Sequence, residues 1–272
     1  MNNLISKILG FRKKIKSEQK TYFAQALQRD VWIEIILPPK YRKSAQYPLV
    51  IFNDGQDFKA LGIHKTLTDL YKQKLISEAI IVGVHCNDNR INEYGTASIP
   101  DYQNRGNKAA EYTHFIINEL LPFLRQQYPI SEDKKDIAIA GFSLGGLSAF
   151  DIAWHHASIF SKVGVFSGAL WWRSEAFHQD NPDAHRIVHD MVAQSEKREG
   201  LRFWFQTGTL DETSDRNNNG IIDAIDDTLD LIACLREKQY AEQDLTYVEI
   251  EDGEHNPQTW GKAILAFLLW AL

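Results

Sequence analysis

The segment at residues 141–146, with the sequence GFSLGG, constrains the fold of this chain more than any other. It places Ser143 at the centre of a G-x-S-x-G pentapeptide. Residues 136–140 before it predict a short buried strand, and residues 147–155 after it predict a helix. A serine between glycines in a sharp strand-to-helix turn is typical of an exposed nucleophile at a helix N-terminus. A glycine-rich turn that only permits close packing is the alternative interpretation.

A nucleophilic serine needs a base to accept its proton and a third group to orient that base. Around such a turn, the expected chain order is serine, acid, histidine. Asp211 directly follows a predicted strand at residues 203–206 and fits the acid, with its neighbour Glu212 as the alternative. His255 follows the predicted strand at residues 246–250, so we expect it to be the base.

Backbone amides are expected to stabilise the oxyanion that forms during acyl transfer. The amide of Leu144, directly after the nucleophile, is the first expected donor. The second is the amide of Gln56, in the turn at residues 53–56 that follows another predicted strand. Each such donor contributes about 3–4 kcal/mol where it has been measured. On spacing alone, a plain turn at residues 53–56 is an equal alternative.

Short apolar runs alternate with amphipathic segments along the chain. Predicted strands cover residues 21–27, 31–37, 49–52, 80–84, 136–140, 163–166, 203–206 and 246–250, and predicted helices cover residues 64–75, 108–128, 147–155, 228–238 and 259–272. The first two strands predict an edge hairpin, and Pro122 is expected to bend its helix. We therefore expect an α/β fold, with a mainly parallel central sheet and helices on both faces. A single domain at residues 21–272 would follow a basic leader at residues 1–20.

Composition excludes some classes of protein. The 272-residue chain has a formal net charge of −6, which argues against a nucleic-acid-binding groove. No apolar run approaches the length of a membrane span, and no secretory h-region is visible. Without a secretion signal, Cys86 and Cys234 are expected to be reduced thiols. We therefore expect a cytoplasmic protein.

Further residues carry a resemblance to a known family. The GFSLGG segment, followed by Ser-Gly-Ala-Leu-Trp-Trp at residues 167–172, resembles the putative esterase family of α/β-hydrolases. That family includes enterochelin esterases, feruloyl esterases, S-formylglutathione hydrolase and mycolyltransferases. The resemblance implies an α/β-hydrolase fold and carboxylic-ester hydrolysis without a cofactor. It also implies that Ser143, Asp211 and His255 form the catalytic triad.

Downstream of the expected acid, residues 215–226 resemble an EF-hand or dockerin-type calcium loop, D-x-N-x-N-G-x-I-D-x-x-D. The predicted ligands are Asp215, Asn217, Asn219, the Ile221 carbonyl, Asp223 and Asp226. The last is shorter than the usual glutamate, and no helix is predicted before the loop. An asparagine-rich and aspartate-rich turn that caps the next helix is the alternative. A bound calcium ion would be structural.

Substrate contacts are expected from two loops that follow strand ends. Trp171 and Trp172 are adjacent, so we expect one to line the pocket while the other packs inward. Arg90 and Tyr94 lie in the other loop, where the arginine could instead hold the loop in place. An aromatic cleft with a polar rim favours a flat or glycosidic ester over one with a long acyl chain.

The sequence thus predicts a serine carboxylesterase that acts on a small-molecule ester through an acyl-enzyme intermediate. The same residues would serve an acyltransferase or a thioesterase. A non-catalytic calcium-binding interaction domain is an alternative of a different class.

Overall fold

A computed structural model describes residues 14–272 of the chain. Within them, eight strands form one sheet in the order β1-β2-β4-β3-β5-β6-β7-β8. Their bounds are β1 Lys16–Ala24, β2 Arg29–Leu37, β3 Leu49–Asn53, β4 Ile80–Val84, β5 Ile137–Phe142, β6 Lys162–Phe166, β7 Arg202–Leu210 and β8 Leu245–Glu254. Strand β2 pairs antiparallel with both β1 and β4, and all other neighbours are parallel. The expected mainly parallel sheet with an antiparallel edge hairpin is confirmed.

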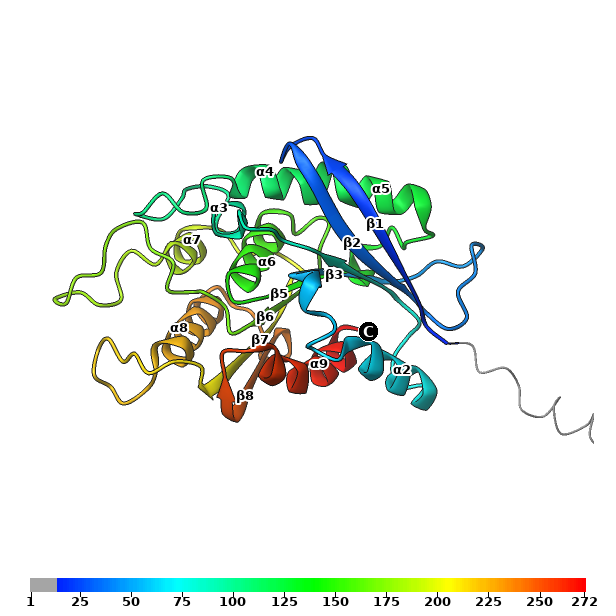
Figure 1. Cartoon of the computed structure of the whole chain (residues 1–272). Coiled ribbons are helices and arrows are strands. Elements are labelled where there is room, and N and C mark those ends of the chain that lie inside the picture. The colour runs from blue at the N-terminus through cyan, green and yellow to red at the C-terminus, as the bar shows by residue number, and fades with distance from the viewer. Residues whose placement is uncertain (1–13) are drawn as a thin grey trace, which may run out of the picture.

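Helices cover both faces of this sheet (Figure 1). Their bounds are α2 Ile63–Gln73, α3 Arg90–Glu93, α4 Ala109–His114, α5 Leu121–Gln127, α6 Leu144–His155, α7 Ile187–Gln194, α8 Asp223–Glu237 and α9 Pro257–Ala271. Helices α2 and α9 pack in one hydrophobic cluster, and α4 to α8 pack in the other. The expected two-layer covering is therefore present.

The strand sequences explain why both faces are covered. In β3, Leu49 and Ile51 belong to one core cluster, and Val50 and Phe52 belong to the other. Successive side chains of a strand point to opposite faces, so a continuous apolar run requires burial on both sides. All five residues of β3 are buried.

Some element boundaries differ from those expected. Strand β1 begins at Lys16, so residues 16–20, which we expected in the basic leader, belong to the sheet. The helix expected at residues 108–128 is divided by a π-helical segment at Phe115–Leu120, and Pro122 lies in the first turn of α5, where its missing N–H costs nothing. Helix α7 lies in a segment for which no element is predicted from the sequence.

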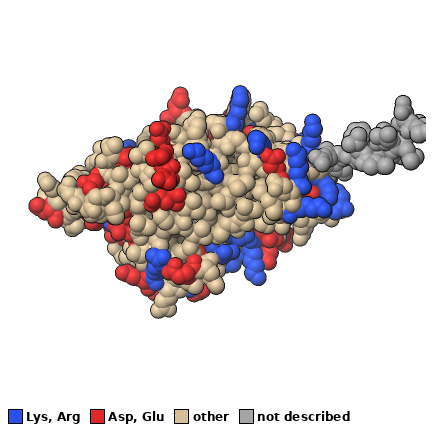
Figure 2. All heavy atoms as spheres, turned by 90° about the horizontal axis from the view of Figure 1, so that it is seen from below, with Lys and Arg blue, Asp and Glu red and all other residues tan. Residues whose placement is uncertain are grey.

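The basic residues near the chain start lie at one end of the molecule. In the face shown in Figure 2, Lys and Arg side chains gather near the end where the described chain begins. Lys14, Lys16, Lys20 and Lys43 line a shallow pocket there with Glu18. The rest of the expected basic leader lies at residues 1–13, outside the described residues. None of the helices in residues 14–272 has the length and apolar character needed to cross a bilayer.

Candidate active site

The residues expected to carry the chemistry lie at one edge of the sheet. Ser143, Asp211 and His255 each come directly after the last residue of a strand, namely β5, β7 and β8. These strands run parallel, so their carboxyl ends lie at the same edge. The turn that follows β3 lies at this edge too. The topology therefore gathers the expected nucleophile, acid, base and oxyanion turn on one side of the molecule.

The turn between β5 and α6 has the geometry of a strained elbow. Ser143 has φ 55° and ψ −121°, a conformation that non-glycine residues rarely adopt. A Cβ atom at Gly141 would lie 2.2 Å from the Gly145 carbonyl oxygen, so a side chain there would force the turn open. The Ser143 amide donates to the Phe166 carbonyl oxygen at 2.8 Å, which ties the turn to β6.

The expected acid and base lie close to each other. Nδ1 of His255 is 3.7 Å from Oδ1 of Asp211. The Asp211 carboxylate is enclosed, whereas the side chain of His255 is 41% exposed. Among the described acidic residues, Asp211 alone lies within ion-pair distance of His255. Glu212, the alternative acid, is not paired with this histidine, and burial raises the pKa of its carboxyl group.

Two glycines allow the ends of β7 and β8 to approach. A Cβ atom at Gly208 would lie 2.2 Å from the Gly253 carbonyl oxygen, so this contact requires glycine. The ladder also shifts register between Gly208 and Leu210. Helix α9 starts at Pro257, two residues after the histidine, and the side chain of Asn256 before it accepts a bond from the Thr259 amide at 3.0 Å. These features fix the backbone on both sides of the acid–base pair.

The turn after β3 is tied to the elbow by a side-chain hydrogen bond. Asn53 donates from its side chain to the Gly145 carbonyl oxygen at 2.8 Å, which joins the two turns. The amide of Leu144 is the first of helix α6 and therefore has no partner within the helix. For the amide of Gln56, the described residues provide no acceptor. Within residues 14–272, neither expected oxyanion donor therefore has another hydrogen-bond acceptor.

Arg90 and Tyr94 contact this turn. Arg90 donates two hydrogen bonds to the Asp54 carboxylate, both at 2.7 Å, and a third to the Phe142 carbonyl oxygen at 3.1 Å. Burial alone would lower the pKa of Arg90, but Asp54 raises it above its ordinary value. Tyr94 has no exposed surface, and its hydroxyl accepts a bond from the Asp54 amide at 3.2 Å. Both residues therefore hold the turn at residues 53–56 in place. Tyr94 is enclosed, whereas the Arg90 side chain is 29% exposed, and its contact with substrate stays a prediction.

The two adjacent tryptophans lie in different environments. Trp172 has no exposed surface, whereas Trp171 is 39% exposed. The guanidinium carbon of Arg105 lies 5.2 Å from the Trp171 ring and 5.0 Å from the Trp172 ring. Arg105 also forms an ion pair with the enclosed carboxylate of Asp101. As expected for adjacent residues, one ring, Trp171, is accessible and the other, Trp172, packs inward; substrate contact by Trp171 stays a prediction.

The loop with the expected calcium ligands has a compact shape. The two carboxylate oxygens of Asp215 accept bonds from the Asn219 and Gly220 amides, at 3.1 and 2.9 Å. The side-chain amides of Asn217 and Asn219 both donate to Asp226, at 2.8 and 3.2 Å. The amide of Ile221, whose carbonyl was the expected ligand, donates to the Asn219 side chain at 2.8 Å. These side chains therefore turn toward one another, and the groups that face Asp226 are the N–H donors of the two asparagines.

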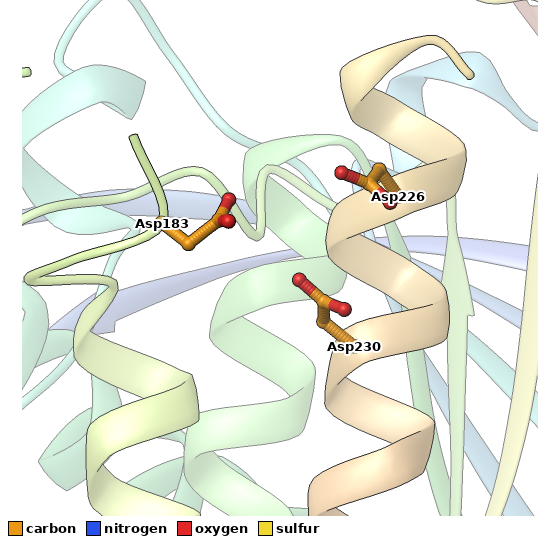
Figure 3. A group of neighbouring side chains, drawn as sticks. All are labelled: Asp183, Asp226 and Asp230. Atoms are coloured by element: carbon orange, nitrogen blue, oxygen red, sulfur yellow. The ribbon is translucent and has the colours of Figure 1, made fainter. Parts of the chain in front are cut away.

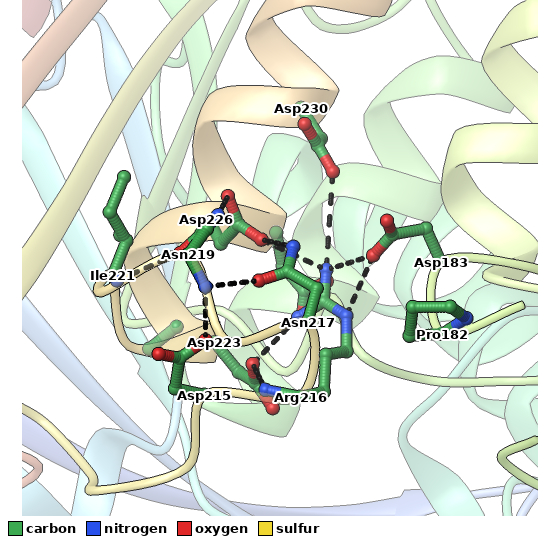
Figure 4. A network of polar contacts seen from close by, with 12 residues as sticks. Pro182, Asp183, Asp215, Arg216, Asn217, Asn219, Ile221, Asp223, Asp226 and Asp230 are labelled. Atoms are coloured by element: carbon green, nitrogen blue, oxygen red, sulfur yellow. Dashed lines mark hydrogen bonds and ion pairs between the residues drawn. The ribbon is translucent and has the colours of Figure 1, made fainter. Parts of the chain in front are cut away.

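The loop itself carries a positive side chain, that of Arg216 (Figure 4). The guanidinium of Arg216 is 2.8 Å from Asp183, 3.1 Å from Asp223, 3.5 Å from Asp226 and 2.9 Å from Asp227. Helix α8 begins at Asp223, so two of the expected ligands lie in its first turn, where carboxylates interact favourably with the helix dipole. The arginine thus neutralises part of the charge that a calcium ion would neutralise. Calcium binding remains a prediction.

A second group of carboxylates includes one loop residue and two residues outside the loop. Ligand atoms of Asp183, Asp226 and Asp230 lie within 4.8 Å of one another (Figure 3). Arg216 contacts all of them, because its Nη2 atom is also 3.9 Å from Asp230. The loop that carries the expected acid is therefore joined to the segment that follows the two tryptophans.

Sequence reasoning missed several residues that shape this edge of the sheet. Asn53 is the last residue of β3, Ser167 comes directly after β6, and Trp260 lies in the first turn of α9. Position at the end of a strand was the available signal for the first two, because ligand sites collect at such ends. No local pattern distinguishes Trp260 from an ordinary core residue.

Comparisons with known proteins show the family of this chain. The family model described as "Putative esterase" matches residues 24–271. The uncharacterized protein YjcH of Bacillus subtilis is 25% identical over 246 residues, which is 89% of this chain and 92% of the relative. The iron(III) enterobactin esterase of Escherichia coli K12 is 24% identical over 175 residues, which is 64% of this chain but only 40% of that enzyme.

Solved structures share the fold at low identity. A ferulic acid esterase superposes with a TM-score of 0.72 and 19% identity, over 95% of this chain and 98% of its own. The enterobactin esterase FES of Shigella flexneri, solved in the presence of enterobactin, superposes with a TM-score of 0.74 and 20% identity, over 94% of this chain and 58% of its own. The expected α/β-hydrolase fold is confirmed, and the family match supports an activity on esters. The chain belongs to the putative esterase family.

Proposed function

We propose that this protein is a serine carboxylesterase in which Ser143, His255 and Asp211 form the catalytic triad. The observation that carries the proposal is the strained backbone of Ser143, with φ 55° and ψ −121°. Such strain costs on the order of 1–3 kcal/mol and persists where function requires it. Here it holds a serine at the carboxyl edge of the sheet, the edge from which the acid and the base also project.

In the proposed reaction, Ser143 Oγ attacks the ester carbonyl carbon while His255 accepts the hydroxyl proton. The amides of Leu144 and Gln56 donate to the oxyanion of the tetrahedral intermediate, because no other acceptor engages them in the described residues. His255 then protonates the departing alcohol. A water molecule, deprotonated by the same imidazole, hydrolyses the acyl-enzyme and restores the serine. Asp211 orients the imidazole and stabilises its charged form.

We further propose that the ester carries an aromatic group. Trp171 is 39% exposed and borders Arg105, so it offers a ring face together with a positive rim. The name of one structural neighbour, ferulic acid esterase, is consistent with this substrate class. Activity should therefore be higher on hydroxycinnamate or benzoate esters than on nitrophenyl laurate. A preference for the long acyl chain would contradict the aromatic assignment.

A fluorophosphonate probe tests the proposed chemistry. The unaltered protein should be labelled, and Ser143→Ala should not be. Ser44→Ala is the matched control, because Ser44 is exposed and lies before β3, at the opposite edge of the sheet. Absence of labelling in the unaltered protein would contradict the proposal and favour the non-catalytic alternative. Adding alcohol or thiol acceptors and measuring their acylated products would distinguish acyl transfer from hydrolysis.

A further inference from the structure

We propose that Ser167 and Trp260 form a positioning pair that aligns the acid, the base and the nucleophile of the proposed triad. The inference rests on the proposed esterase function and extends it to residues outside the triad. Both residues are buried, with exposed fractions of 2% for Ser167 and 6% for Trp260. Ser167 follows β6, the strand between those that end at the nucleophile and the acid.

The hydrogen bonds of this pair have a fixed direction. Nε1 of Trp260 lies 3.0 Å from the hydroxyl of Ser167, and that hydroxyl lies 3.0 Å from Oδ1 of Asp211. An indole nitrogen can only donate, and an ionised carboxylate can only accept. The Ser167 oxygen must therefore accept from Trp260, and its single proton must point to Asp211. The serine hydroxyl thus cannot rotate without losing one of two buried hydrogen bonds.

This arrangement fixes the carboxylate that faces His255. The other oxygen of Asp211 accepts a bond from the Gly208 amide at 2.9 Å. With each oxygen held by a donor, rotation of the carboxylate would break at least one bond inside an enclosed site. The oxygen that Ser167 holds is also the one 3.7 Å from His255. Ser167 therefore sets the position from which the acid meets the base.

The ring of Trp260 packs against the proposed base and against the residue that precedes the nucleophile. It meets the imidazole of His255 edge to face, with ring centroids 5.3 Å apart and an angle of 83°. It also stacks on Phe142, the residue before the nucleophile, at 5.2 Å and 27°. One indole therefore packs against the base and the elbow, while its N–H acts on the acid through Ser167.

The backbone of Ser167 supports a functional role for its side chain. Its φ is 44°, in the left-handed region where glycine is favoured. Its amide donates to the Gln206 carbonyl oxygen at 2.7 Å, which holds this conformation. If only the turn mattered, glycine would serve better at this position. A serine here indicates that the hydroxyl is needed.

Steady-state kinetics of substituted proteins test the inference. Ser167→Ala and Trp260→Phe should each lower kcat by up to about 10²-fold with little change in KM, because a misplaced triad affects the reaction more than binding. Ser167→Gly should be as impaired as Ser167→Ala, although it relieves the backbone. The double substitution should be no worse than Ser167→Ala, because the indole N–H acts through that hydroxyl.

Two controls change the same residue types at neighbouring places in the fold. Ser161 is a buried serine directly before β6, and its hydroxyl has no partner in the described residues. Trp270 lies on the same helix as Trp260, and its Nε1 atom also has no partner there. Ser161→Ala and Trp270→Phe should retain the kcat of the unaltered enzyme. Equal losses in these controls would assign the effects to general packing and overturn the inference.

A double-mutant cycle with the acid gives the sharpest readout. In an Asp211→Asn background, Ser167→Ala should cause little further loss of kcat, because the serine acts on catalysis through that carboxylate. A full additional loss would overturn the inference, as would normal kcat in Ser167→Ala or recovery in Ser167→Gly. Fluorophosphonate labelling of the unaltered protein reports separately on the proposed function. Labelling combined with normal kcat in Ser167→Ala would refute the positioning pair alone.

Discussion

The imidazole of His255 and the carboxylate of Asp211 lie 3.7 Å apart, between Nδ1 and Oδ1. This distance is longer than a hydrogen bond, and catalytic contacts in unliganded enzymes often tighten only when substrate binds. The Ser167 hydroxyl and the Gly208 amide each hold one oxygen of Asp211, so this carboxylate has little freedom to move. Closure of the gap therefore requires movement of His255, whose side chain is 41% exposed.

The proximity of Asp211 to His255 predicts that Asp211, and not the adjacent Glu212, orients the base. Asp211→Asn should lower kcat by on the order of 10⁴-fold, because an amide cannot stabilise the charged imidazole and favours the wrong tautomer. Glu212→Gln, at the neighbouring position, should retain most of the activity. Initial rates on a nitrophenyl ester check both. The reverse ranking would assign the acid to Glu212.

The ion pair between Arg90 and Asp54 predicts a stability effect. Asp54 is 1% exposed, so Arg90→Met would leave a buried carboxylate without its two-bond partner. We expect a loss of about 3 kcal/mol in the free energy of unfolding. Arg236→Met is the control, because its pair with Glu242 is exposed to solvent and should contribute much less to stability. Urea unfolding measures both, and equal effects would contradict the prediction.

The contrast between the two tryptophans predicts separate effects. Trp172→Ala removes a fully buried side chain and should destabilise the fold by about 3–5 kcal/mol. Trp171→Ala should have little effect on unfolding but should raise KM for aromatic esters, because Trp171 is the exposed ring. Unfolding curves and steady-state kinetics on both proteins separate the two roles. An unchanged KM in Trp171→Ala would remove this residue from the substrate site.

The loop after the expected acid gives a prediction about calcium. If residues 215–226 bind the ion, a concentration a hundred times the Kd should add about 2.7 kcal/mol to the free energy of unfolding. Asp215→Ala should abolish that gain, because both of its oxygens organise the loop. Asp180→Ala, at an exposed position, should retain the gain.

Calorimetric titration of the unaltered protein with calcium tests whether the ion binds. Absence of binding heat together with an unchanged unfolding curve at millimolar calcium would contradict the prediction. Among the described residues, Arg216 would then be the only positive group paired with the loop carboxylates Asp223 and Asp226. The alternative from the sequence, a turn that precedes a helix, would stand.

The sheet and the elbow could be predicted from the sequence because their signals are local. The apolar run of β3 and the glycines around Ser143 each specify a structure within a few residues. Strand β1 was partly missed because its exposed side chains are polar, as in many edge strands. Its Lys and Glu residues gave no apolar alternation to detect.

The links between distant segments could not be predicted in this way. Ser167 and Trp260 are 93 positions apart in sequence, and their bond exists only because α9 returns to the carboxyl edge of the sheet. Arg216 is similarly joined to Asp183, 33 positions away. The sequence could place the expected triad by order along the chain, but the side chains that hold it depend on how remote elements pack.

A buried carboxylate on the nucleophile helix predicts how stability depends on pH. Asp151 on α6 is 1% exposed, and burial raises the pKa of its carboxyl group from 3.8 to about 7. One oxygen accepts a bond from the Ala97 amide at 2.9 Å, and the other has no hydrogen-bond partner in the described residues. Nδ1 of His155 lies 3.8 Å from that second oxygen, and burial lowers the pKa of this histidine.

Between pH 3.8 and about 7, which are the ordinary and the raised pKa of Asp151, the folded protein binds the Asp151 proton more tightly than the unfolded chain does. Stability should therefore fall as the pH rises from about 4 to about 7, and this contribution should be constant above that range. Relative to Asp151→Asn, the unaltered protein should lose on the order of 4 kcal/mol across the interval. Asp190→Asn, at an exposed position on α7, controls for removal of one carboxylate. Urea unfolding at intervals of pH checks the prediction, and a constant difference between the unaltered protein and Asp151→Asn would contradict it.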